Sequence, residues 1–166
     1  GVLVYDDHDG TANGKLDIDV TAYLSQGGNL IAMKAHDSAG SNEWIRAHLN
    51  IIIRVSTDTT WRAIGPVGNL EGQSINNVGL VWESEHAGWN TDMNYDDSDA
   101  AGWTNAIRSV QKDDAIWVNG DGVNGSTPAY FRKKFYLSAF PTLALLDIGA
   151  DDDVQFYLNG VLVYDD

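Results

Sequence analysis

One seven-residue segment occurs twice in this chain. The sequence GVLVYDD fills residues 1–7 and returns as residues 160–166, so the two copies are 159 positions apart. Self-similarity at a fixed period is the sequence signature of tandem-repeat proteins. We therefore interpret the chain as one period of a longer array together with a short overlap. A single domain that carries a duplicated end segment, as in a permuted chain, is the alternative interpretation.

The second copy of the segment lies in a predicted β-hairpin. Residues 154–166 read VQFYLNGVLVYDD, in which Asn159-Gly160 separates two apolar runs. Asn-Gly favours the type I′ turn of a two-residue hairpin, because both central residues need a positive φ. The first copy lacks the first strand of this hairpin, so its backbone needs another partner, and in a continuous polymer the preceding repeat supplies it. The predicted inter-repeat strand comprises Gly1, Val2, Leu3, Val4 and Tyr5, and in the second copy Gly160, Val161, Leu162, Val163 and Tyr164.

Charge and cysteine content exclude several classes of function. The chain has 166 residues, which is enough for one domain with a sizeable core. Only 10 Lys and Arg residues stand against 24 Asp and Glu residues, a formal charge of −14, which argues against binding to nucleic acid or to anionic lipid. The absence of cysteine excludes disulfides, thiolate metal sites and thiol catalysis. No apolar run approaches membrane-spanning length, so membrane insertion is not expected.

Short strands separated by turn signals dominate the rest of the chain. Apolar runs predict strands at residues 16–23, 30–36, 44–53, 79–83, 116–118, 130–137 and 143–148. The one candidate for helix is residues 100–111, with room for one or two turns. Many short strands with turn signals about every 8 to 12 residues are typical of a β-sandwich or barrel. We therefore expect an all-β fold with few or no helices.

Three segments of the chain resemble one known family. Residues 130–160 contain YFRKKFYL and LALLDIGADDDVQFYLNG, residues 94–103 read NYDDSDAAGW, and residues 17–37 read DIDVTAYLSQGGNLIAMKAHD. Together they resemble the core motifs of galactose-binding-like domains, which are appended to many secreted glycosidases and surface proteins. The resemblance implies a mainly antiparallel jelly-roll β-sandwich.

The order of these segments differs from that in the family. The segment that resembles residues 17–37 follows the other two in the family, whereas here it precedes them. The resemblance therefore implies that residues 1–54 form the C-terminal part of one jelly-roll repeat and that residues 55–166 form the N-terminal part of the next. Nearly the whole chain is covered under this permutation.

Two acidic runs are candidates for metal binding. Closely spaced oxygen ligands on a Gly-containing loop suit calcium, which takes six to eight oxygens, although their spacing is not that of an EF-hand. An ordinary solvated loop is the alternative interpretation. The second run, residues 151–153, is interpreted as turn residues that bond backbone amides rather than as a metal cluster. The candidate calcium ligands are Asp6, Asp7, Asp9, Asn13 and Asp17.

Aromatic side chains in the long central loops are candidates for stacking on sugar rings, as such side chains do in carbohydrate-binding modules of this fold. The candidate residues are Trp82, Trp89, Tyr95 and Trp103. The alternative is that Trp61, Trp103 and Trp117 fill the sandwich and the others cover its open ends. The basic run at residues 132–134 is interpreted as exposed edge charge or as an internal partner for acids.

No catalytic motif supports an enzyme. The four histidines do not have the spacing of a zinc helix, and no G-x-S-x-G sequence is present. We expect a structural repeat unit of an extracellular filament or long surface adhesin, joined head to tail to copies of itself and rigidified by calcium. The alternative is a carbohydrate-binding module of a secreted glycosidase or surface protein, with glycans as partners. Either function places the chain outside the cell or at its surface.

Overall fold

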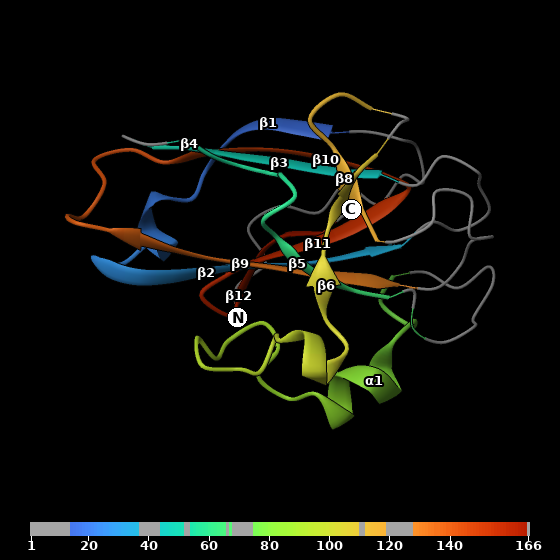
Figure 1. The fold of residues 1–166 in the computed structure, drawn as a ribbon. Helices are drawn as coiled ribbons and strands as arrows, with labels where there is room; N and C mark the ends of the chain where they lie inside the picture. Colours follow the sequence, from blue (N-terminus) through green and yellow to red (C-terminus); the bar gives the residue numbers. More distant parts are fainter. Residues whose placement is uncertain are drawn as a thin grey trace.

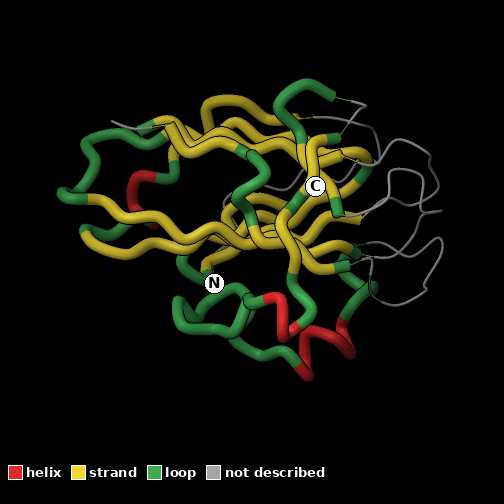
Figure 2. The backbone as a smooth tube through the Cα atoms, viewed as in Figure 1, coloured by secondary structure: helices red, strands yellow, loops and turns green. Residues whose placement is uncertain are grey.

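Two antiparallel β-sheets lie face to face in this protein (Figures 1 and 2). The computed structural model describes residues 14–36, 44–51, 54–65, 67, 75–109, 112–118 and 128–165. Every strand pairing among these residues is antiparallel, and their one α-helix is short. The all-β sandwich predicted from the sequence is thus confirmed.

The upper sheet of Figure 1 has the strand order β1-β10-β3-β8-β7, and β4 also pairs with β3. Its strands are β1 (Gly14–Asp19), β3 (Trp44–Asn50), β4 (Arg54–Ser56), β7 (Ile107–Arg108), β8 (Ile116–Trp117) and β10 (Leu145–Asp151). The lower sheet has the order β12-β11-β2-β9-β5-β6. Its strands are β2 (Gly27–His36), β5 (Arg62–Ile64), β6 (Thr104–Asn105), β9 (Ala129–Leu137), β11 (Asp153–Leu158) and β12 (Val161–Asp165).

The main core lies between the two sheets. Alternate residues of a strand point to the same face, so β2 directs Ile31, Met33 and Ala35 toward the upper sheet. From the upper sheet, Ile45, Ala47 and Leu49 of β3 meet them, and all six side chains are buried. Trp61 and Trp117 belong to the same cluster. The alternation read from residues 44–53 therefore identified a core face correctly.

The lower sheet is also buried on its other face. The alternate residues of β2, from Leu30 to His36, are fully covered as well, with at most 1% exposure. Their cover is the segment of residues 75–103, which carries α1 (Leu80–Glu85) and the 3₁₀ turn η2 (Asp99–Ala101) and lies below the lower sheet in Figure 1. A second buried cluster forms there from Ala32, Trp89, Trp103 and Tyr130. The sandwich thus has a third layer on one side.

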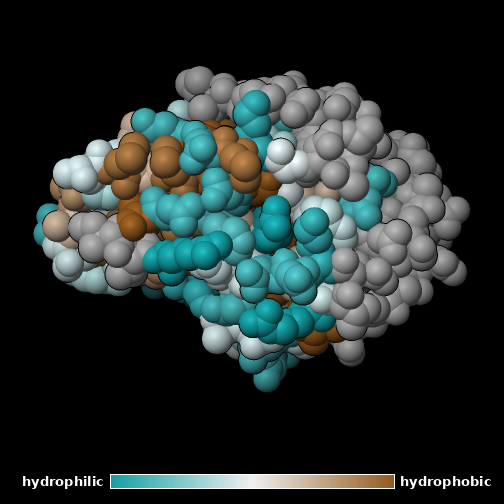
Figure 3. Space-filling model, turned by 90° about the horizontal axis from the view of Figure 1, so that it is seen from above, coloured by the Kyte–Doolittle hydropathy of each residue, from teal (hydrophilic) through white to brown (hydrophobic). Residues whose placement is uncertain are grey.

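The described part of the upper sheet's outer face has no such layer. Seen from above in Figure 3, hydrophilic and hydrophobic side chains lie side by side on it. Two leucines at this sheet are well exposed, Leu16 at 63% and Leu143 at 53%. Among the described residues, the helices are too short and too polar to cross a membrane.

One local prediction was wrong, and two elements are shorter than predicted. Residues 79–83 form the start of α1 rather than a strand, because Gly79 adopts a left-handed φ of 73° and the chain then turns so that Leu80 and Val81 face solvent. The strand predicted from residue 16 ends at Asp19, whose carboxylate accepts hydrogen bonds from the Thr21 amide (3.0 Å) and hydroxyl (2.6 Å). This turn leads into the 3₁₀ helix η1 (Thr21–Tyr23).

The predicted helical turns at residues 100–111 are reduced to η2, followed by the short strands β6 and β7. Residues 54–56, which follow the predicted strand at residues 44–53, form β4 and pair back onto β3.

Candidate functional site

The C-terminal hairpin forms as the sequence predicts. Asn159 and Gly160 connect β11 to β12 with φ angles of 51° and 82°, the positive values that a type I′ turn requires. The Asn159 side chain also fixes the turn to β2, because its Oδ1 accepts from the Leu30 amide (2.8 Å) and its Nδ2 donates to the Tyr23 carbonyl (2.8 Å). A Cβ at Gly160 would clash with Cγ2 of Thr91, so glycine is required there for space as well as for φ.

The second copy of the repeated segment forms β12, which is the last of the described strands at one end of the lower sheet. β12 pairs with β11 and stands at the end of the lower sheet's strand order. Val163 and Tyr164 of this strand have no exposed surface and join the main core. The surface beside β11 that receives these side chains therefore fits the sequence VLVY, and we call this surface the slot. The first copy, Gly1 to Tyr5, lies outside the described residues.

The two segments that the family resemblance assigns to successive repeats are interleaved in both sheets. β2 lies between β9 and β11, and β10 lies between β1 and β3. Residues 14–36 and 44–50 therefore gain their strand partners largely from residues 116–158. Whichever copies of the chain supply them, these segments form one common core.

Most of the candidate calcium ligands, Asp6, Asp7, Asp9 and Asn13, lie outside the described residues. The exception, Asp17, is exposed in β1, has a φ of 59°, and its amide donates to Oδ1 of Asp147 at 3.0 Å. In the described ranges, no group of three or more acidic or histidine side chains is placed to hold a metal ion. Calcium binding therefore stays a prediction.

The second acidic run takes part in local pairing. The Asp152 amide donates to the His36 carbonyl at 3.2 Å. The Asp153 carboxylate lies 3.2 Å from Nδ1 of the fully buried His36. Asp151 ends β10 and Asp153 begins β11, so the interpretation of residues 151–153 as turn residues is correct only for Asp152, and the Asp153 carboxylate contacts a histidine ring rather than a backbone amide.

The four aromatic residues considered for sugar binding come together against the lower sheet. The ring centroid of Trp82 lies 6.2 Å from those of both Trp89 and Trp103, and that of Tyr95 lies 6.0 Å from that of Trp103. Trp82 stacks on Tyr130 of β9 at 4.1 Å. Trp89 and Trp103 are only 3% and 0% exposed, while Trp82 and Tyr95 are partly buried. Packing of the third layer is thus one use of these rings, and only the two partly buried ones retain surface that a ligand could touch.

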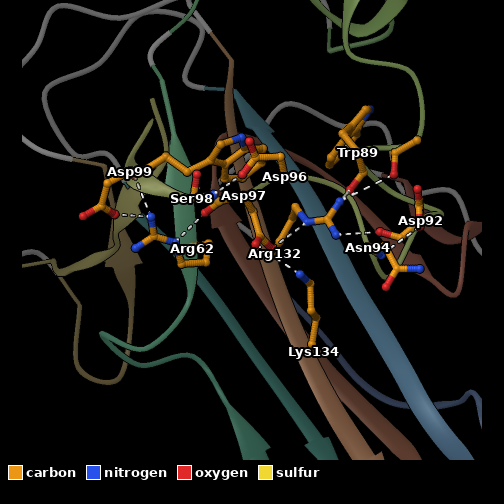
Figure 4. Close-up of polar contacts among 12 residues, drawn as sticks. Arg62, Trp89, Asp92, Asn94, Asp96, Asp97, Ser98, Asp99, Arg132 and Lys134 are labelled. Atoms are coloured by element: carbon orange, nitrogen blue, oxygen red, sulfur yellow. Dashed lines mark hydrogen bonds and ion pairs between the residues drawn. The ribbon is translucent and has the colours of Figure 1, made fainter. Parts of the chain in front are cut away.

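A polar hub that the sequence did not identify is built around Asp97 (Figure 4). Its carboxylate accepts from Nε of Arg132 (3.2 Å) and from Nζ of Lys134 (3.1 Å), and its carbonyl accepts from Nε of Arg62 (2.8 Å). Three cations from β5 and β9 therefore converge on one residue of the covering segment. The basic run at residues 132–134 was the signal in the sequence, and its interpretation as an internal partner for acids is correct for Arg132.

The guanidinium of Arg132 is fully buried, and each of its three nitrogens donates a hydrogen bond. Besides Asp97, it donates to the main-chain carbonyls of Trp89 and Asp92, the latter at 2.8 Å, and it lies 4.8 Å from the ring centroid of Tyr95. Burial lowers the pKa of Arg132, and the charge of Asp97 opposes that shift. One side chain of β9 thus holds three separate points of the covering segment.

A second buried ion pair fastens α1 to the sheet. Nζ of Lys34, which is 1% exposed, lies 2.7 Å from Oε1 of Glu83, and the Tyr130 hydroxyl donates to the same oxygen at 2.9 Å. Burial lowers the pKa of Lys34, an effect that Glu83 opposes, and burial raises the pKa of Tyr130. A charged side chain in an otherwise apolar strand, here Lys34 in β2, is the sequence signal for an acidic partner on the outer face of this sheet.

Comparison with known proteins gives no relative: no family model, curated protein or solved structure matches this chain.

Proposed function

We propose that this chain is a structural repeat unit of an extracellular filament or long surface adhesin, in which successive jelly-roll beads are joined head to tail. The observation that carries the proposal is that, among the described strands, the second copy of the repeated segment stands at the end of the lower sheet. β12 is the second copy of GVLVYDD, and its side chains fill a slot along β11 at the end of the lower sheet. The first copy has the same sequence and therefore fits the same slot.

Two segments of identical sequence and one place for them beside β11 favour association between copies. The described lower sheet has one strand, β11, beside which this sequence packs. When β12 occupies that place, the identical segment at residues 1–7 is left to complete an equivalent sheet in a neighbouring copy. Addition of a strand to an open sheet edge combines main-chain hydrogen bonds with side-chain pockets, which gives both affinity and register.

The interleaved sheets supply a large shared surface for such an array. Strands β1, β2 and β3 bury their core faces against β9, β10 and β11. If residues 1–54 of one repeat complete residues 55–166 of another, as the family resemblance implies, the junction is the hydrophobic core itself. A junction of that kind joins beads rigidly, as a filament requires.

The test is whether the slot accepts the strand from another molecule. A shortened chain of residues 8–159 has neither copy of the segment and so leaves the slot open. A peptide of residues 159–166 should bind it with a rise in melting temperature, because a ligand that binds only the folded state stabilises it. A peptide with Val163→Asp and Tyr164→Asp is the matched control, since both side chains are buried in β12.

Imaging is a second test of the filament or adhesin proposal, and it does not require the shortened chain. Material purified from its native source should show rods with a regular axial bead repeat. Compact, isolated monomers from that source would refute the filament or adhesin proposal, and failure of the natural peptide to bind a folded 8–159 chain would refute the strand slot.

A further inference from the structure

A pocket of about 200 Å³ opens between the lower sheet and the covering segment. Its walls are formed by Thr60, Arg62, Asp97, Arg132, Lys133 and Lys134. Four of these six side chains are cationic, although the whole chain has only 10 Lys and Arg residues and a formal charge of −14. The pocket thus gathers cationic side chains on an acidic protein, and each of them has a carboxylate partner, Asp97, Asp99 or Asp58.

The donors of this pocket already hold one carboxylate. The two oxygens of Asp97 accept from Arg132 and Lys134, at 3.2 and 3.1 Å (Figure 4). Arg132 is fully buried and keeps this contact in place. Arg132 is therefore committed to Asp97, whereas the Lys134 ammonium, which is 36% exposed, has three N–H donors and can also donate to a carboxylate, sulfate or phosphate oxygen of a ligand.

The carboxylates that pair with the other two cations, Lys133 and Arg62, are exposed to solvent. Lys133 donates to the Thr60 hydroxyl and lies 3.6 Å from the Asp58 carboxylate, whose side chain is 45% exposed. Arg62 pairs with Asp99, whose side chain is 88% exposed, and its guanidinium also donates to two main-chain carbonyls of the covering segment and to a side-chain amide oxygen of β6. Exposed ion pairs contribute little free energy, so an incoming anion replaces the Asp58 and Asp99 carboxylates at small cost, while the other hydrogen bonds of Arg62 hold its guanidinium in place.

We propose that this pocket binds an oxyanion, the carboxylate, sulfate or phosphate group of a small ligand, between Arg62, Lys133 and Lys134. Arg132 acts as a positioning residue, because its guanidinium is occupied by Asp97 and by main-chain carbonyls. The volume is below the roughly 300–1,000 Å³ of pockets that enclose drug-sized ligands, so the site grips one charged group or one ring. This proposal does not depend on the filament or adhesin proposal.

The test is a titration of the full chain followed by NMR chemical shifts at constant ionic strength. Sodium sulfate, sodium phosphate and galacturonate are the anionic probes, and galactose is the neutral match for galacturonate. We expect saturable shifts of pocket residues with sulfate, phosphate or galacturonate and none with galactose. Saturation by galacturonate alone supports a carboxylated sugar as the source of the anion, and saturation by all three supports a general oxyanion site.

Variants separate the pocket from general charge effects. Lys134→Met should weaken binding by about tenfold, the equivalent of one charge-assisted hydrogen bond. Lys112→Met removes the same charge at a residue over the Trp44 ring, outside the pocket, and should leave the affinity unchanged. Asp58→Asn should tighten binding, because it removes an internal competitor for Lys133. The proposal is overturned if no anion saturates at about 10 mM, or if Lys112→Met and Lys134→Met weaken binding equally.

Discussion

Asp97→Asn should destabilise the fold far more than its conservative size suggests. The substitution keeps the shape of the side chain and removes the one carboxylate that contacts the fully buried guanidinium of Arg132. Arg132 would then keep only neutral partners, the main-chain carbonyls of Trp89 and Asp92. A buried charge that has lost its counter-ion is among the costliest defects in a protein interior.

The expected cost is about 3 kcal/mol of the free energy of unfolding. Removal of one partner of a buried ion pair costs roughly 3–5 kcal/mol, and the low end applies because the side-chain amide oxygen that the substitution introduces can still accept a hydrogen bond. The Asp97 side chain is itself 18% exposed, which also argues for the low end. For a chain of this size, about 3 kcal/mol corresponds to a fall in melting temperature of roughly 6–12 °C.

Asp99→Asn is the matched control. It makes the same chemical change two residues away, where the carboxylate is 88% exposed and pairs with Arg62. Exposed pairs contribute under about 1 kcal/mol, so this variant should melt within about 4 °C of the wild type. Urea unfolding followed by tryptophan fluorescence measures both variants. Equal losses for Asp97→Asn and Asp99→Asn would refute the argument that burial of Arg132 makes its partner indispensable.

Three further outcomes are expected. Gly160→Ala should lower the urea midpoint, because the new methyl group clashes with Thr91 and the position has a φ of 82°. The double variant with Thr91→Ala should recover the part of this loss that the clash causes, and no recovery would contradict the contact between residues 91 and 160. Burial, together with Arg54 and Arg46, lowers the pKa of His48. The unfolded chain therefore binds more protons than the folded chain near the ordinary His pKa of about 6.5, so this contribution to the free energy of unfolding is retained above that pH and lost as the pH falls below it. His48→Gln should reduce the difference between the free energies of unfolding measured by urea titration at about pH 7.5 and pH 5, and an unchanged difference would count against this role of His48. Addition of about 1 mM calcium should raise the melting temperature of the full chain, and a chelator should reverse the rise; no shift would remove the calcium prediction.

The features predicted from sequence are those that depend on near neighbours. The hairpin at Asn159-Gly160 follows from the φ preference of two adjacent residues, and β9 follows from the aromatic pairs that flank its Arg-Lys-Lys run. The alternation of residues 44–53 identified a core face because one side of β3 meets the lower sheet. Each of these patterns has its cause within about ten residues.

The third layer could not be predicted in the same way. The helix α1 has only six residues, and its exposed Leu80 and Val81 produce an apolar run that is typical of a strand. Its position is set by Lys34 and Arg132, which lie about 50 residues away on either side along the chain. Contacts between such distant residues leave no periodic pattern, so the basic run at residues 132–134 indicated acidic partners but did not identify Asp97 as one of them.

If copies of this protein associate as proposed, the third layer restricts the directions in which they can do so. A bare sheet can stack face to face and grow in two directions, as in amyloid-like assemblies. Here residues 75–103 cover the outer face of the lower sheet and are fastened by two buried ion pairs, Lys34 with Glu83 and Arg132 with Asp97. In the described part of the chain, that sheet can then gain strands only beside its two end strands, of which β12 is longer than β6. In the proposed assembly, a covered face would therefore favour growth along a line over growth in a plane.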